Sequence, residues 1–215
     1  MLKKILKLLK KNKKKRYKNY FLKDNLKAEI ESKLCSVGKW SYGSPKVYRW
    51  DWDAKLNIGS FCSLGPEIKF YIGGNHRNDW VTTSPLPAHQ FSYYFTKAEK
   101  IQNHLFPALD INIGHDVWIG GHSIILSGSK IGNGAIIGAG SLVAGEVDPY
   151  SIYAGNPIKK IRDRFEKSLS DRLNNSKWWD LDDSTINDLS KYLCSNDFEG
   201  FFNNLEIIKK NKQKL

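Results

Sequence analysis

The chain has 215 residues, of which 40% are hydrophobic and 26% charged, and its formal net charge at pH 7 is +12. This length and composition predict one globular domain with appendages. Residues 1–27 carry 12 Lys or Arg and one acid, which leaves 22 basic and 21 acidic residues in 28–215. Because the body is nearly neutral, we expect no nucleic-acid-binding groove and no nucleic-acid partner.

Residues 1–27 are predicted to form a basic amphipathic tail. Leu2, Ile5, Leu8 and Leu9 follow helical spacing, and lysines fill the remaining face. Lysine interrupts the segment too often for the apolar core of a signal peptide or for a membrane span. A short basic helix of this kind can lie on an anionic membrane surface. A solvated, frayed tail is the alternative.

The three cysteines indicate a reducing compartment. Cys35, Cys62 and Cys194 are an odd number without paired spacing. This argues against a disulfide framework and for the cytoplasm, at the inner face of the membrane if the tail binds there.

Residues 28–160 are predicted to form stacked coils built from units of six residues. The early units, at 37–41 and 58–62, are irregular. Residues 73–110 have no sixfold period, which predicts a long loop projecting from one edge of the coils.

The most regular stretch is 113–148, which reads in sixes as IGHDVW, IGGHSI, ILSGSK, IGNGAI, IGAGSL and VAGEVD. Such a short repeat predicts a β-helix in which each unit is one short strand and a corner. The aliphatic first residue and the small fifth residue should point inward. The frequent Gly at the second place should adopt corner angles that a β-carbon would penalise.

Beyond the repeat, residues 161–215 are predicted to form a helical segment. Ile161, Phe165, Leu169 and Leu173 have helical spacing, and the stretch WWDLDDSTINDLSKYL continues it.

The words SYG-P-V, IGSFCSL, GGNHRNDW, DVWIGG, AGNP and WWD follow one another from about residue 28 to 200. In this order they resemble the hexapeptide-repeat acyltransferases, in particular the xenobiotic acetyltransferase branch. That branch includes chloramphenicol and streptogramin acetyltransferases and bacterial sugar O-acetyltransferases. The resemblance implies a left-handed parallel β-helix and a homotrimer with active sites between subunits. It also implies transfer of acetyl from acetyl-CoA to a hydroxyl, with no metal cofactor.

His76 in GGNHRNDW matches the catalytic histidine of the family that the chain resembles. An alcohol is a poor nucleophile until a base removes its proton, and imidazole suits that task near neutral pH. Asn75, Arg77, Asp79 and Trp80 are the residues expected to orient this loop or to contact the acceptor.

The resemblance also places acetyl-CoA along the outside of the late coils. Trp118, Gly121, Ala139, Ala144 and Gly145 would line the pantetheine arm. Lys159 and Arg162 would face the nucleotide phosphates, because phosphate oxygens favour Lys and Arg.

The acceptor is expected to be a sugar hydroxyl, in a surface polysaccharide or a lipid-linked glycan. The stretch SPLPAHQFSYYF replaces the glycine-tryptophan loop of antibiotic-modifying members, and a membrane-binding tail suits a lipid-carried substrate. Acetylation of chloramphenicol or a streptogramin is the first alternative, and a non-catalytic β-solenoid scaffold is the second. A zinc site made of His76, His115 and His122 is a further alternative, although the spacing of His115 and His122 does not match that of zinc-dependent relatives.

Overall fold

The computed structural model describes residues 20–51 and 53–212. Of the predicted basic tail, residues 1–19 therefore lie outside the described part. The described residues divide into two units, one ending at Ser170 and one beginning at Asp171. Among them, no helix has both the length and the apolar character needed to cross a membrane.

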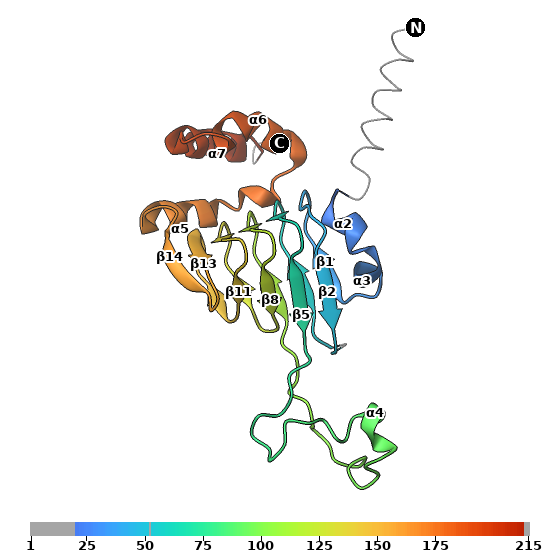
Figure 1. Cartoon of the computed structure of the whole chain (residues 1–215). Coiled ribbons are helices and arrows are strands. Elements are labelled where there is room, and N and C mark those ends of the chain that lie inside the picture. Colours follow the sequence, from blue (N-terminus) through green and yellow to red (C-terminus); the bar gives the residue numbers. More distant parts are fainter. Residues whose placement is uncertain (1–19, 52, 213–215) are drawn as a thin grey trace. The chain divides into compact units, whose positions relative to one another are not determined.

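The first unit is a parallel β-solenoid with three faces (Figure 1). The first sheet has the order β1 (Cys35–Val37), β3 (Leu56–Ile58), β6 (Ile111–Ile113), β9 (Lys130–Ile131), β12 (Glu146–Val147). The second has the order β4 (Ser63–Leu64), β7 (Trp118–Ile119), β10 (Ile136–Ile137), β13 (Ser151–Ala154), β14 (Lys159–Asp163). The third has the order β2 (Lys46–Arg49), β5 (Lys69–Ile72), β8 (Ile124–Leu126), β11 (Leu142–Val143).

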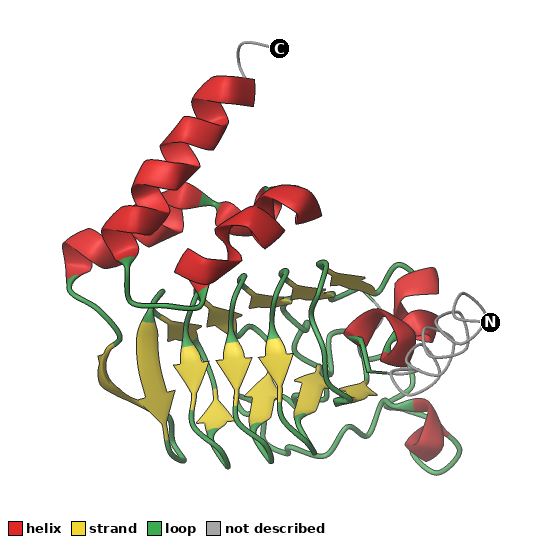
Figure 2. Cartoon of the chain, turned by 90° about the horizontal axis from the view of Figure 1, so that it is seen from above, coloured by secondary structure: helices red, strands yellow, loops and turns green. Residues whose placement is uncertain are grey.

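From β3 to β13 the chain visits these sheets in a fixed rotation of first, second and third. Neighbouring strands within each sheet are parallel and belong to successive coils, which lie beside one another in Figure 2. The exception is β14, which turns back and pairs antiparallel with β13. The helical spacing expected from Ile161 onward begins instead at Lys167, because residues 159–163 form this strand.

The predicted inward places of the repeat are confirmed. All six aliphatic residues at the first place are at most 5% exposed, and all six small residues at the fifth place are at most 4% exposed. The six aliphatic residues of the first place, with Val117, Ala135 and Val147 of the fifth, belong to one continuous core that extends back to Leu22. Each buried aliphatic residue contributes about 1.5–3 kcal/mol to the stability of the fold. The buried side chains of the stacked coils therefore supply most of the hydrophobic stabilisation of this unit.

The role expected for the second-place glycines was wrong. Their φ angles are not positive, and left-handed angles occur instead at the fourth place, where Gly128, Gly134 and Gly140 sit. At the four second places that hold Gly, the next coil is too close for a side chain, whereas Leu126 and Ala144 occupy the other two, along the third sheet. A β-carbon on Gly120 would lie 2.5 Å from the backbone nitrogen of Ala139. Close approach of backbone, rather than special backbone angles, therefore selects Gly at the second place.

Two short helices, α2 (Leu22–Asn25) and α3 (Lys27–Glu31), precede the first coil. The side chain of Leu22 is fully buried in the solenoid core, and its backbone N–H donates to Ser41 O at 3.0 Å. The opening of the described chain is thereby attached to the first coil.

The second unit is helical. The helix α5 (Lys167–Ser176) crosses the boundary between units, and the 3₁₀ helix η1 (Trp178–Asp180), α6 (Asp183–Leu193) and α7 (Phe198–Lys212) follow. Leu189, Phe201 and Leu205 form its buried core, and Arg172 pairs with Glu199 at 2.6 Å. This unit therefore has an apolar core of its own.

Candidate active site

The segment of residues 73–110 connects β5 to β6 and extends away from the coils, carrying the short helix α4 (His89–Ser92) (Figure 1). Its outgoing and returning legs meet close to the solenoid. His76 forms an isolated antiparallel bridge with Leu105, and the N–H of Phe106 donates to Asn75 O at 3.2 Å. Residue 76 is therefore held at the base of the loop rather than at its tip.

The imidazole of His76 has one defined partner. Its Nδ1 lies 2.8 Å from the backbone carbonyl oxygen of Thr83. Because a carbonyl oxygen only accepts hydrogen bonds, Nδ1 must carry the proton in this contact. In neutral imidazole Nε2 is then unprotonated, which is the form that a general base requires.

His76 opens onto a cavity of about 470 Å³ on the outer side of the third sheet. The cavity combines an aromatic wall, a short stretch of loop backbone and three residues of the late coils. Its lining residues are Trp50, Tyr71, Gly73, Gly74, Asn75, His76, Leu126, Ser127 and Ala144.

The aromatic wall comes from a column of outward residues, one on each coil. Tyr48 pairs in register with Tyr71, which pairs with Leu126, and Ala144 follows the next strand of the sheet. The two tyrosine rings stack with centroids 4.9 Å apart and planes 21° apart. The outward side chains become smaller along the column, from the ring of Tyr71 to the isobutyl group of Leu126 and the methyl group of Ala144. This decrease in size leaves the cavity beside Tyr71.

Ser127 is not free to act as a nucleophile. Its hydroxyl donates to Leu109 O at 2.7 Å and accepts from Leu109 N at 2.8 Å. Cys35 and Cys62 are buried, and burial raises the pKa of Cys35 to about 12 and that of Cys62 to about 11. Their thiols therefore stay protonated at neutral pH, and neither cysteine is among the residues that line this cavity.

Of the four residues predicted to orient the loop or contact the acceptor, only Asn75 lines the cavity. Arg77 donates through Nε to Asp79 Oδ1 at 2.7 Å, and this contact lowers the pKa of Asp79. The Arg77 guanidinium also lies 5.4 Å from the ring centroid of Trp80 and 4.5 Å from that of Phe106. These contacts brace the loop internally, and a role of these residues toward the acceptor stays a prediction.

The predicted donor-binding residues are divided between two places. Ala144 lies in the His76 cavity, and Gly145 follows it. Trp118, 56% exposed, and Arg162 belong to one row of the second sheet, with Ile136 and Ile152 between them. Three strand spacings make this separation about 14 Å.

The remaining donor candidates also lie away from His76. Gly121 accepts from the N–H of Gly140, which brings Gly121 and Ala139 to one corner in successive coils. Lys159 is exposed on β14, opposite Ala154. None of these three residues is among those that line the His76 cavity.

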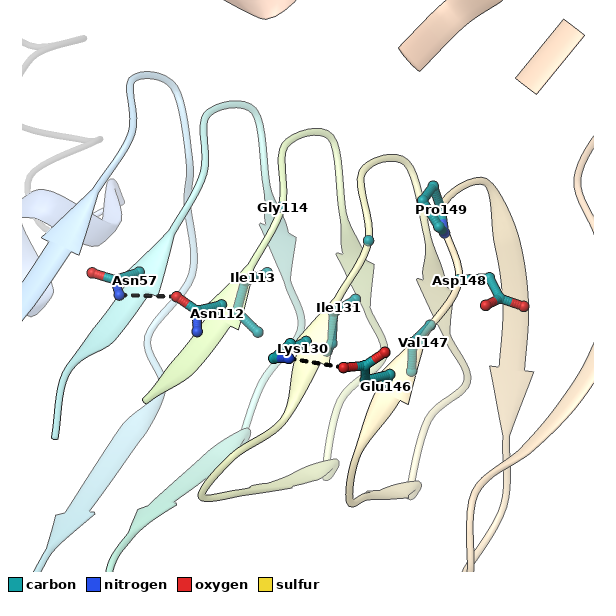
Figure 3. Close-up of a pocket in the computed structure, with 11 residues that line it drawn as sticks. Asn57, Asn112, Ile113, Gly114, Lys130, Ile131, Glu146, Val147, Asp148 and Pro149 are labelled. Atoms are coloured by element: carbon teal, nitrogen blue, oxygen red, sulfur yellow. Dashed lines mark hydrogen bonds and ion pairs between the residues drawn. The ribbon is translucent and has the colours of Figure 1, made fainter. Parts of the chain in front are cut away.

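A second hollow, of about 380 Å³, lies on the first sheet (Figure 3). Asn57 donates to Asn112 at 3.0 Å, and Lys130 pairs with Glu146 at 2.8 Å. A further charged side chain of this hollow, that of Asp148, is paired with Lys160 at 3.0 Å. Because these polar groups satisfy one another, this face is a ladder of paired side chains without a free base.

The other repeat histidines do not join His76. The Nδ1 of His115 accepts from the backbone N–H of Ser60 at 3.0 Å, and His122 is exposed. Over residues 20–51 and 53–212, no three or more His, Cys, Asp or Glu side chains are grouped so as to hold a metal ion.

The aromatic wall is the part of this site that sequence analysis missed. Tyr48 lies on β2 and Trp50 directly follows it, two residues apart, which is the spacing of residues on one face of a sheet. That spacing was a usable signal. Their contact with Tyr71, 23 residues after Tyr48 in the sequence, could not be predicted, because the early coils do not keep the sixfold period.

Comparison with known proteins places these features in a family. Residues 110–145 match the model described as bacterial transferase hexapeptide (six repeats). The chain is 38% identical over 168 residues to a chloramphenicol acetyltransferase of Agrobacterium fabrum (strain C58 / ATCC 33970), covering 72% of this chain and 79% of that protein.

Two further relatives extend the match. A chloramphenicol acetyltransferase of Morganella morganii is 36% identical over 203 residues, covering 85% of this chain and 95% of that protein. A probable macrolide acetyltransferase of Lysinibacillus sphaericus is 41% identical over 142 residues, covering 66% of this chain and 78% of that protein.

Proposed function

This chain belongs to the hexapeptide-repeat acetyltransferases, and we propose that it transfers an acetyl group from acetyl-CoA to a sugar hydroxyl with His76 as general base. Membership of this family makes it an acyltransferase and removes the scaffold alternative. The observation that carries the proposal is the bond from His76 Nδ1 to Thr83 O, which leaves Nε2 as the basic nitrogen beside the cavity.

The reaction is a direct transfer. Nε2 of His76 takes the proton of the acceptor hydroxyl while the oxygen attacks the thioester carbonyl carbon. The carbon–sulfur bond then breaks, coenzyme A leaves as thiolate, and the proton passes from the imidazolium to sulfur. No acyl-enzyme is needed, which agrees with the fully engaged hydroxyl of Ser127.

The donor is proposed to lie along Trp118, Gly121 and Ala139, with Ala144 and Gly145 near the reacting end and Lys159 and Arg162 at the phosphates. Because His76 and most of these residues lie apart in one chain, we propose a homotrimer of left-handed solenoids. In it, the second sheet of one subunit faces the His76 cavity of its neighbour.

The acceptor is proposed to be a sugar of a surface polysaccharide or a lipid-linked glycan. A sugar ring has an apolar face of C–H groups that packs on an aromatic ring, and Tyr71 supplies such a wall beside His76. Asn75 also lines the cavity, and an asparagine amide can both donate to and accept from hydroxyl groups. The basic residues of 1–27 would bring the enzyme to the cytoplasmic face of an anionic membrane, where such acceptors are carried.

Antibiotic acetylation is the second candidate. Relatives with the names chloramphenicol and macrolide acetyltransferase favour it. A planar aromatic acceptor could also stack on Tyr71, so the wall alone does not separate the two.

The deciding experiment measures free thiol release from acetyl-CoA with a panel of sugar nucleotides, lipid-linked oligosaccharides, chloramphenicol and a streptogramin. We expect turnover with the sugars, and turnover only with a drug would replace the sugar by the antibiotic. His76→Ala should lower kcat/KM by roughly 10²–10⁴-fold. The control is His122→Asn, an exposed histidine outside the cavity where Asn tolerates the left-handed angle. Equal rates for His76→Ala and the native protein would refute the assignment of the base.

A further inference from the structure

The loop that carries His76 leaves and rejoins the solenoid at one corner, and we propose that Trp50 and Asp51, which form this corner after β2, position His76 for catalysis. The proposal rests on the proposed function, because the position of His76 matters only if His76 is the base. Asp51 is a positioning residue that acts through the loop backbone, whereas Trp50 supports the outgoing leg and also lines the cavity.

The outgoing leg of the loop contacts the corner through two glycines. Gly73 and Gly74 have φ angles of +79° and +81°. A β-carbon on Gly74 would lie 3.0 Å and 3.2 Å from Cε3 and Cδ2 of the Trp50 indole, and one on Gly73 would lie 2.8 Å from Asp51 Cβ. Gly74 therefore packs directly against the Trp50 indole, which leaves no room there for a side chain. His76 follows only two residues later.

The returning leg is tied to the same corner by one carboxylate. Asp51 Oδ2 accepts from the backbone N–H of Ala108 at 3.1 Å, while Oδ1 accepts from Asp53 N at 2.9 Å and Ala54 N at 3.3 Å. The hydrogen bonds from Ala108 and Asp53 hold the pKa of Asp51 below its usual value, so the carboxylate is ionised at neutral pH. Asp51 thus joins its own turn to a residue 57 positions later.

The corner is itself fixed to the solenoid. The side chain of Arg49 is 4% exposed and donates to Asp51 O at 3.1 Å and to Leu34 O at 3.2 Å. It also pairs with Glu29 at 3.3 Å. The two loop legs are therefore attached to the first coil through this corner. The bridge between His76 and Leu105 joins the two legs to each other. A misplacement of about 1 Å in a reacting group can lower a rate by about 10²-fold. Because these contacts hold His76 in position, we expect their loss to slow turnover.

The test is Asp51→Asn, which keeps the size of the side chain but cannot accept at both oxygens. The matched control is Asp53→Asn, which removes the same charge from the same turn, where the Asp53 carboxylate is exposed. We expect Asp51→Asn to lower kcat roughly ten- to hundredfold with an unchanged KM for acetyl-CoA. Backbone hydrogen exchange should become faster in residues 73–80 and 104–109. Because Trp50 also lines the cavity, its variants are compared by hydrogen exchange: Trp50→Phe should keep the native exchange in residues 73–80, whereas Trp50→Ala should speed it as Asp51→Asn does.

A native kcat in Asp51→Asn would overturn the proposal, as would an equal loss in Asp53→Asn or a loss that matches a lower folded fraction at the assay temperature. Hydrogen exchange needs no turnover, so it tests the corner even if the proposed function is wrong. Equal exchange in Asp51→Asn and the native protein would refute the proposal, whereas native turnover in His76→Ala would refute only the assignment of the base.

Discussion

The late coils and the loop of residues 73–110 are held in place by different means. In the late coils each residue repeats the contact of the residue one coil earlier, so the Ile and Val of the first place stack into a continuous core. The loop has no such repetition and depends on single contacts at its base, such as the bond from Ala108 N to Asp51 and the bridge at His76. Stability is thus spread over many equivalent residues, whereas the geometry of the site depends on a few.

This difference predicts that a core substitution in the late coils has a large effect on stability. Ile125 is fully buried between Phe70 and Val143 of the neighbouring coils. Ile125→Ala should lower the free energy of unfolding by about 2–5 kcal/mol, because it leaves a cavity. Urea unfolding measures the change, with Ile124→Ala on the partly exposed outer face as control. Equal losses in both variants would contradict the assigned register.

Substituting a glycine of the late coils tests the same packing with a smaller expected effect on stability. A β-carbon on Gly132 would lie 2.5 Å from the backbone nitrogen of Pro149, whereas one on Gly140 meets nothing within 4 Å. Gly132→Ala should cost about 1–3 kcal/mol through overpacking. Gly140→Asn should stay near native, because Asn tolerates the φ of +71°. A native melting temperature for Gly132→Ala would contradict the close approach of the coils.

The smallest expected effect is a change in pH dependence at Asp116, a charged residue within the late coils. Burial raises the pKa of Asp116 to about 6, and the Arg164 guanidinium 3.7 Å away opposes this only in part. A carboxyl whose native pKa is raised favours folding below its unfolded pKa and loses that contribution as pH rises through about 6. The melting temperature of the native protein should therefore fall relative to that of Asp116→Asn between pH 4 and pH 7. Parallel melting curves over this range would contradict the raised pKa.

Sequence analysis was most successful where one contact recurs. The sixfold spacing predicted which residues of 113–148 face inward, because every coil places its first and fifth residues in the same environment. Its motifs also predicted the acyltransferase family that the relatives confirm. The spacing did not reveal why Gly occupies the second place, because the distance between backbones of successive coils is a property of the stacked structure.

The candidate site was less accessible to sequence analysis. His76 was found through the word GGNHRNDW, and its catalytic role stays a prediction. The wall at Tyr71 and the corner at Asp51 were missed, because each depends on contacts between residues 23 to 57 positions apart in irregular coils. No local pattern encodes such contacts, and only the stacked coils bring those residues together.

If the acceptor binds at the proposed site, the tapering column of Tyr48, Tyr71, Leu126 and Ala144 divides the acceptor surface into steps, one on each coil. Each residue stands on its own coil, and its neighbours up and down the column are fixed by strand register rather than by its own side chain. Exchanging Leu126 for a larger or smaller residue would raise or lower one step of the floor beside Tyr71 while the inward core stayed the same. Under the proposed function, a substitution at one position of the column would therefore change acceptor choice while the inward core kept the fold.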